Sequence, residues 1–147
     1  MQISAAQHSD VAAWLRLAEE VVPLFGPMPG FDAVLAREIA QKQAYCARTG
    51  IGSAAFTGCV LISNNGLQIA IRWLAVSSEF RRRGIGKMLV EAVLSSVLSE
   101  SIIHVDTFVA GSSGSEADRR LYESCGFSPS EILGEADMIR QRYARKL

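Results

Sequence analysis

Apolar residues near the start of the chain recur every three or four positions, which is the spacing of one helix face. Residues 1–6 can form a short strand, and Ser9 or Asp10 can cap the helix that follows. The apolar face of this helix consists of Val11, Trp14, Leu15, Ala18, Val21 and Val22. Prolines and glycines over 23–30 interrupt the pattern, and a second helix is expected over 32–41 with Asp32 as its cap.

The spacing changes from helical to alternating in the next part of the chain. Strands are predicted over 43–48, 53–63 and 67–76. Thr49-Gly50 and Asn64-Asn65-Gly66 separate them, and Asn-Gly favours a tight hairpin turn, so we expect antiparallel neighbours. The third strand has alternating apolar residues that predict a common buried face: Ile69, Ile71 and Trp73.

Helices and strands alternate in the rest of the sequence. A helix is predicted over 85–99, a strand over 102–109 and a helix over 116–124 that Gly126 ends. Final strands fit around 127–129 and 133–143, although 135–145 also fits a helix. The order predicts an α/β (α+β) fold with a mixed sheet, and the length suits one domain over 1–147.

The composition is that of an ordinary globular protein, 49% hydrophobic and 20% charged. Fifteen basic residues balance fifteen acidic ones, which argues against a nucleic-acid or anionic-membrane partner. The three cysteines, Cys46, Cys59 and Cys125, have no metal-ligand spacing, so we expect reduced thiols, no metal and a cytoplasmic protein. The first residues predict no signal peptide, and no apolar run approaches the ~20 residues that span a bilayer.

A basic loop with two glycines lies between the strand that ends at Val76 and the helix that starts near Ile85. The first N–H groups of a helix lack internal partners and lie at the positive end of its dipole, so they can bind phosphate. Gly84 and Gly86 allow close approach of an anion. The positive charge comes from Arg81, Arg82, Arg83 and Lys87. A solvated basic turn is the alternative interpretation.

Two common nucleotide-binding loops do not fit this segment. A Walker loop requires Ser or Thr after its Gly-Lys pair, but Met88 follows Gly86-Lys87. A dinucleotide-binding loop requires a third glycine where this chain has Leu89. Such a loop also follows a strand of a βαβ unit, whereas the strand before this loop is predicted to belong to a hairpin.

Two segments together resemble the GNAT N-acetyltransferase superfamily. Leu74-Ala75-Val76 followed by Arg81-x-x-Gly84-x-Gly86 is similar to its acetyl-CoA signature, and residues 117–127, ADRRLYESCGF, resemble its helix that ends in Tyr and Gly-Phe. The resemblance covers roughly 67–127. It implies a mostly antiparallel sheet with helices on both faces, splayed to admit acetyl-CoA. The implied activity transfers an acetyl group from acetyl-CoA, the co-substrate, to a small-molecule or protein amine.

The resemblance also implies roles for individual residues. Backbone amides of the loop would hold the coenzyme pyrophosphate, through Arg81, Arg82, Arg83, Gly84, Ile85, Gly86 and Lys87. The strand residues that would pair with the pantetheine arm are Leu74, Ala75 and Val76, and the Val76 N–H is a candidate oxyanion donor. Tyr122 would protonate the departing thiolate, and Ser115 replaces the family's usual Asn as a coenzyme contact.

The general base and the acceptor site are less clearly indicated. Some family members carry a Glu on the strand before the loop, but this stretch is Ile69-Ala70-Ile71-Arg72. His104 and Asp106 share a strand face and are candidates for base or substrate anchor, with a merely polar face as the alternative. The family shapes its acceptor site in the loop that here carries Phe25, Met28 and Phe31.

Other functions remain open at this point. The missing strand carboxylate favours a non-catalytic module that senses acyl-CoA, since a fold does not fix a function. A nucleic-acid-directed acetyltransferase would use the basic cluster at 140–146, but the zero net charge argues against it. Family members often dimerise, so the resemblance makes a homodimer an option. Cys125 is interpreted as structural rather than as an acyl carrier.

Overall fold

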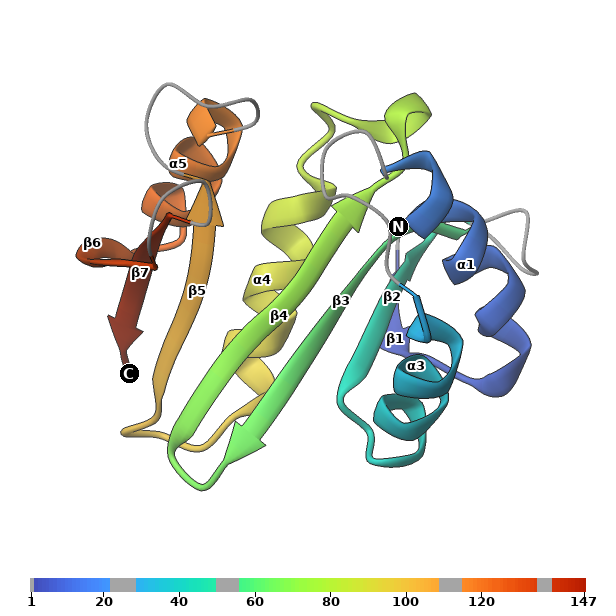
Figure 1. The fold of residues 1–147 in the computed structure, drawn as a ribbon, viewed down its shortest axis with the longest axis horizontal. Helices are drawn as coiled ribbons and strands as arrows, with labels where there is room; N and C mark the ends of the chain where they lie inside the picture. The colour runs from blue at the N-terminus through green and yellow to red at the C-terminus, as the bar shows by residue number, and fades with distance from the viewer. Residues whose placement is uncertain (1, 22–28, 50–55, 109–114, 135–138) are drawn as a thin grey trace.

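The computed structural model describes residues 2–21, 29–49, 56–108, 115–134 and 139–147. Within them a seven-stranded sheet has the order β1-β2-β3-β4-β5-β7-β6 (Figure 1). The strands are β1 Gln2–Ala5, β2 Ala44–Arg48, β3 Phe56–Asn65, β4 Gln68–Val76, β5 Ile102–Phe108, β6 Ser128–Leu133 and β7 Arg140–Lys146. The helices are η1 His8–Asp10, α1 Val11–Glu20, α3 Phe31–Ala40, η3 Ser78–Phe80, α4 Ile85–Ser96 and α5 Ser115–Ser124.

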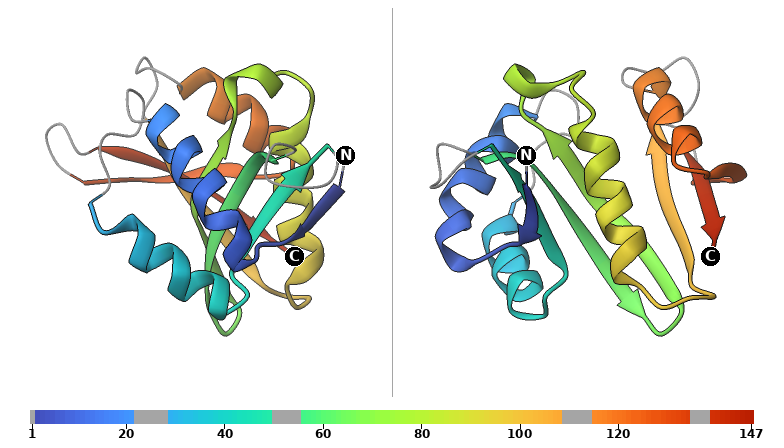
Figure 2. Two further views of the ribbon diagram at one scale, coloured as in Figure 1. Left: turned by 90° about the vertical axis from the view of Figure 1, so that its right-hand side faces the viewer. Right: turned by 180° about the vertical axis from the view of Figure 1, so that it is seen from behind.

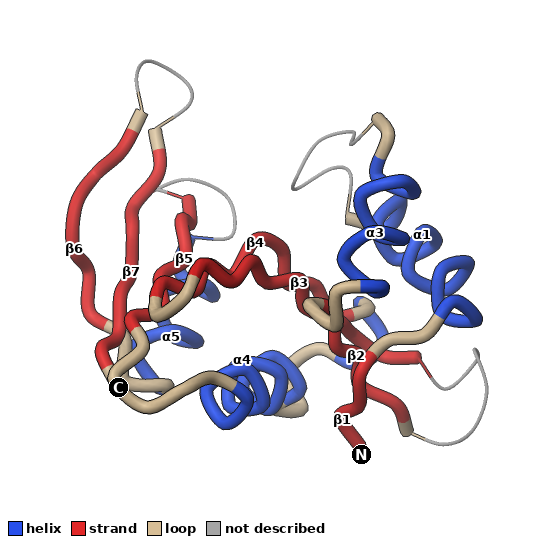
Figure 3. The backbone as a smooth tube through the Cα atoms, turned by 90° about the horizontal axis from the view of Figure 1, so that it is seen from below, coloured by secondary structure: helices blue, strands red, loops and turns tan. Residues whose placement is uncertain are grey.

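Helices cover both faces of this sheet, as predicted. Helices α1 and α3 pack on one face, and α4 and α5 on the other (Figures 2 and 3). The first interface buries Trp14, Leu17 and Leu35, while the second buries Leu89 and Val93. No helix in the described ranges has the length and apolarity to cross a membrane.

The predicted strand pairing is confirmed in its main features. Strands β2, β3 and β4 are antiparallel neighbours, and Gly66 adopts the left-handed backbone that the Asn-Gly turn requires, with φ +66°. The C-terminal segment forms the antiparallel pair β6–β7, so the helical alternative for 135–145 is wrong for its described residues. Residues 53–55 and 109, which we assigned to strands, lie outside the described residues.

Asp10 occupies the predicted N-cap position of α1, whereas the start of α3 and the end of α4 differ from the prediction. Asp10 makes no side-chain cap on α1, because its carboxylate accepts hydrogen bonds from the Gln7 N–H at 2.7 Å and Arg48 at 2.5 Å. Gly30, not Asp32, precedes the first residue of α3. Helix α4 ends at Ser96, three residues before the predicted end, and an extended Val97 follows it.

The predicted common face of Ile69, Ile71 and Trp73 is wrong, because β4 contains a bulge. Leu61 of β3 pairs with Trp73 while its neighbour Ile62 pairs with Ile71, so Arg72 is an extra residue in β4. The bulge reverses the alternation. Ile69 and Ile71 pack towards α4, whereas Trp73 packs with the side chains of α1 and α3.

Strands β4 and β5 pair along only part of their length. They are the parallel pair of the sheet, and their register runs from Gln68 opposite Ile102 to Ile71 opposite Val105. Beyond this point β4 continues to pair with β3 up to Val76, and β5 with β7 up to Phe108. The two strands therefore diverge towards their carboxyl ends, which confirms the predicted splay (Figure 1).

Candidate functional site

The start of α4 presents backbone donors without protein acceptors. Gly84 precedes the helix with φ +78°, and Arg82 has φ +63°. In the described part of the chain, no hydrogen bond is made by the N–H groups of Ile85, Gly86 and Lys87, whereas Met88 N–H donates to the Gly84 carbonyl at 3.0 Å. These open amides at the positive end of a helix suit a phosphate group.

The glycines of the loop have different surroundings. A Cβ at Gly84 would meet nothing within 4 Å, so its role lies in its left-handed backbone. A Cβ at Gly86 would point at the Leu121 side chain, 3.5 Å away, and the Leu74 side chain, 4.0 Å away. A side chain at Gly86 would therefore fill the space between Leu121 and Leu74 near the start of α4.

The basic side chains of the loop are exposed. Arg81 donates from Nε to the Val76 carbonyl at 3.2 Å, and Arg83 lies over the Phe80 ring at 5.3 Å. Arg82 and Lys87 are also exposed. The loop therefore places positive charge around the open amides, in agreement with the expected phosphate site.

The end of β4 offers backbone groups to the opening. Ser77 N–H donates to the Thr57 carbonyl of β3 at 2.8 Å. Along an antiparallel ladder, every second residue makes such hydrogen bonds to the neighbouring strand. Ala75, two residues before Ser77, therefore also bonds to β3. Leu74 and Val76 occupy the alternate positions and direct their N–H and C=O groups away from β3. Of the three residues expected to hold pantetheine, only these two face the splay.

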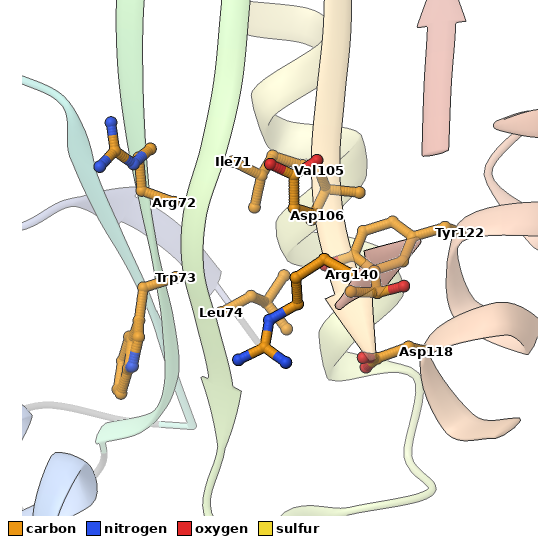
Figure 4. Close-up of a pocket in the computed structure, with 10 residues that line it drawn as sticks. Ile71, Arg72, Trp73, Leu74, Val105, Asp106, Asp118, Tyr122 and Arg140 are labelled. Atoms are coloured by element: carbon orange, nitrogen blue, oxygen red, sulfur yellow. The ribbon is translucent and has the colours of Figure 1, made fainter. Parts of the chain in front are cut away.

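A cavity of about 220 Å³ occupies the splay between β4 and β5 (Figure 4). Its lining comes from β4, β5, α5 and β7: Ile71, Arg72, Trp73, Leu74, Val105, Asp106, Thr107, Asp118, Tyr122 and Arg140. Tyr122 reaches into the opening from α5, and Leu74 faces it from β4 (Figure 4). The cavity thus brings the candidate general acid Tyr122 to the same opening as Leu74 of β4.

The Tyr122 ring is fixed by aromatic neighbours. It contacts Phe127 in an edge-on arrangement at 5.6 Å and stacks on Tyr143 at 6.3 Å. Burial, together with the Asp118 carboxylate, raises the pKa of Tyr122. The phenol is therefore protonated at neutral pH and able to donate a proton or a hydrogen bond to sulfur.

A second cavity of about 280 Å³ adjoins the first on the sheet face away from α4. It is lined by Ala70, Ile71, Arg72, His104, Asp106 and Arg142. Two hydrogen bonds from Arg142, at 2.7 and 3.1 Å, hold Asp106 and lower its pKa. Burial, with Arg142 nearby, lowers the pKa of His104. Of the two candidate bases His104 is the better, because it is neutral near pH 7 while Asp106 is a weak base in an ion pair.

The Asp106–Arg142 pair predicts a pH-dependent contribution to stability. Folding lowers the pKa of Asp106. The ionised carboxylate therefore stabilises the folded protein at pH values above its unfolded-state pKa of about 4. This stabilisation is lost as the pH falls through the pKa that Asp106 has in the folded protein. The pair is partly exposed, so we expect Asp106→Asn to cost about 1 kcal/mol or less at pH 7. Urea unfolding at pH 7 and pH 3 measures this, and an equal deficit at both values would contradict it.

The predicted acceptor residues are only partly described. Phe31 is the first residue of α3, and its ring contacts Trp73 at 5.4 Å. Because Trp73 lines the first cavity, Phe31 lies next to a residue of the cavity wall. Phe25 and Met28 lie outside the described residues, and so does the side chain of Ser115, the first residue of α5.

Several cavity residues were not assigned to the site from the sequence, among them Trp73, Thr107, Asp118 and Arg140. Asp118 lies one helical turn before Tyr122, so helix periodicity could have found it. Arg140 pairs with Phe108 across β5 and β7, which local patterns do not predict. Arg72 was noted only as a position without a carboxylate, and its place at both cavities depends on the bulge.

Cys125 has the surroundings of a structural thiol. Its side chain is buried, and burial raises its pKa. Its carbonyl accepts a hydrogen bond from Arg145, which ties the end of α5 to β7. A thiol with little thiolate character is a poor acyl carrier.

Comparison with known proteins identifies the family. A ribosomal-protein-alanine N-acetyltransferase from Brucella melitensis has a TM-score of 0.80 at 14% identity, with 100% of both chains covered. A GNAT-family acetyltransferase from Bacillus cereus has a TM-score of 0.79 at 16% identity and covers 99% of this chain and 96% of its own. A Salmonella typhimurium protein solved with its cofactor acetyl-CoA has a TM-score of 0.74 at 16% identity, covering 99% and 92%.

These structures confirm the predicted fold. No sequence among the curated proteins matches the chain. The family model of the acetyltransferase (GNAT) domain matches residues 40–129. This range includes strands β4 and β5, which line both cavities, the loop before α4, and helix α5. The chain therefore belongs to the GNAT acetyltransferase family.

Proposed function

We propose that the protein transfers the acetyl group of acetyl-CoA to a primary amine by direct attack on the thioester. The observation that carries this proposal is the combination of open amides at Ile85, Gly86 and Lys87 with a cavity between β4 and β5 that Tyr122 lines. A neighbour in the same fold, the Salmonella protein, was solved with acetyl-CoA.

The coenzyme would lie along this path. Its pyrophosphate binds the amides at the start of α4, with the exposed arginines supplying charge. Its pantetheine arm passes Gly86 and hydrogen-bonds to the free edge of β4 at Leu74 and Val76. The thioester then reaches the splay, where the Val76 N–H or a neighbouring β4 donor stabilises the oxyanion.

The transfer step uses groups that line the cavity. The neutral amine attacks the thioester carbonyl carbon, and the C–S bond breaks as the tetrahedral intermediate collapses. Tyr122 gives its proton to the thiolate and recovers one from the acylated nitrogen through water. His104 in the adjoining cavity accepts the amine proton beforehand through water, since Asp106 is held by Arg142.

A screen of amines with acetyl-CoA tests the activity, with free CoA and the acetylated product measured separately. We expect stoichiometric CoA and N-acetyl product with at least one acceptor. Acetyl-CoA binding without product from any amine would contradict the proposal and support an acyl-CoA sensor. Absence of acetyl-CoA binding would contradict both.

Single loop arginines should have small effects on the coenzyme. Arg82→Gln and Arg83→Gln each remove an exposed charge, which is worth up to about 1 kcal/mol, so we expect acetyl-CoA affinity to fall by up to about fivefold. Rising ionic strength should weaken wild-type binding more than binding by either variant. Calorimetry at two salt concentrations measures this. Arg16→Gln, an exposed residue on α1, is the control without a predicted effect.

A further inference from the structure

Arg72 occupies an unusual position at the acceptor end of the site. It is the extra residue of the β4 bulge and lines both cavities. Its guanidinium lies on the same side of β4 as Trp73, whereas Tyr122 and Asp118 approach from the other side (Figure 4). It also lies apart from the phosphate loop, which follows the far end of β4. Its charge therefore lies at the two cavities and away from the predicted diphosphate site.

The charge of Arg72 has no protein counterion in the described residues. No hydrogen bond or ion pair there involves its guanidinium, and its side chain is exposed. The nearby carboxylate of Asp106 is already held by Arg142 through two hydrogen bonds. An arginine cannot serve as a base, so Arg72 does not replace the strand carboxylate that other family members use.

Charged side chains of both signs line the first cavity. Two arginines and two aspartates line it: Arg72, Arg140, Asp106 and Asp118. Arg142 holds Asp106 through two hydrogen bonds and also contacts Glu131 at 3.5 Å. An amine that carries its own carboxylate could place that carboxylate against the exposed guanidinium of Arg72. The Trp73 indole beside Arg72 adds a flat apolar wall for the rest of the acceptor.

We propose that the acceptor is an amine with a carboxylate close to its amino group, and that Arg72 binds this carboxylate beside Trp73. The inference rests on the proposed acetyltransferase function. The carboxylate belongs either to a free amino acid or to an acidic residue next to a peptide's N-terminus. In both cases Arg72 determines specificity by pairing with the anion, and its field also favours the neutral, nucleophilic form of the amine.

Matched acceptors and charge variants of Arg72 test this proposal. One set compares amino acids with their amides, and another compares Ala-Asp with Ala-Asn N-terminal peptides. A hydrogen-bonded pair with a charged group typically changes binding by about 10- to 100-fold. In one of the two sets, we therefore expect kcat/KM for the acceptor with the carboxylate to exceed that for its neutral partner by this factor. Arg72→Gln should remove the preference, Arg72→Lys should keep most of it, and Arg72→Glu should reverse it. Arg16→Gln is again the control.

Binding provides a second readout that does not depend on turnover. The chain has two tryptophans, Trp14 and Trp73, which stack at 6.0 Å, so intrinsic fluorescence reports on the cavity wall. With CoA present, anionic members should change this fluorescence in wild type and bind at least tenfold more weakly to Arg72→Gln. The inference would be overturned if wild type acetylated and bound the anionic and neutral acceptors of both sets equally well. A preference for the anionic acceptor that survives in Arg72→Gln would overturn it as well. Unimpaired acetyl-CoA binding and transfer in that case would leave the proposed function standing.

Discussion

Tyr122→Phe is expected to lower kcat by about 10²- to 10⁴-fold while acetyl-CoA affinity stays within a fewfold of wild type. The phenol is buried, protonated and faces the splay, so its hydroxyl is placed to deliver a proton when the C–S bond breaks. Phenylalanine keeps the ring contacts with Phe127 and Tyr143. Only the proton donor is removed, and the effect should appear in turnover rather than in binding.

Tyr143→Phe is the matched control for this substitution. Tyr143 is also buried and stacks on Tyr122, but it does not line the described cavity. We expect turnover within about twofold of wild type, because no proton transfer uses its hydroxyl. Steady-state kinetics and calorimetry with acetyl-CoA measure both variants. Wild-type turnover in Tyr122→Phe would remove Tyr122 from the mechanism, and equal losses in both variants would indicate disturbed packing.

Gly86→Leu is expected to weaken acetyl-CoA binding by about 10- to 100-fold. The Cβ at this position would already contact Leu121 at 3.5 Å, and the rest of a leucine would extend between Leu121 and Leu74. Overpacking typically costs 1–3 kcal/mol, and here the cost would fall on the bound state because the proposed coenzyme position places pantetheine in this space. Calorimetry with acetyl-CoA measures the loss.

Gly86→Ala is the matched control for Gly86→Leu. Its methyl group would lie at ordinary contact distance from Leu121 and Leu74, and Gly86 has no left-handed backbone. We expect coenzyme affinity within about threefold of wild type and a gain in stability of roughly 0.5–1 kcal/mol, because alanine favours a helix over glycine. Equal coenzyme affinity of the Leu and Ala variants would place the pantetheine arm elsewhere.

The parts of the fold that follow from local patterns were predicted from the sequence. Turn residues such as Asn65-Gly66 set the β3–β4 hairpin, and the apolar spacing of Ile85, Leu89 and Val93 set the buried face of α4. The C-terminal strands were ambiguous, because β6 is largely exposed and its pattern therefore carries little alternation. Pairing with β5 decided their conformation, and pairing partners are distant in sequence.

The coenzyme half of the site was easier to anticipate than the acceptor half. The Arg81–Lys87 loop and Tyr122 belong to contiguous motifs; the structure leaves the amides at the start of α4 open and places Tyr122 on the cavity wall. The position of Trp73 and Arg72 depends on a one-residue bulge, which arises only from the register of β4 against β3. The neutralisation of Asp106 likewise depends on Arg142, a partner on a separate strand.

The amide resonances of the α4 start test the central claim most directly. In ¹⁵N–¹H spectra, acetyl-CoA should shift the signals of Ile85, Gly86 and Lys87 strongly, because their open N–H groups would donate to the diphosphate. Pantetheine, which lacks the diphosphate, should leave them nearly unchanged while it shifts Leu74 and Val76. If saturating acetyl-CoA left the signals of these three α4 amides unshifted, the assignment of the coenzyme site would be contradicted.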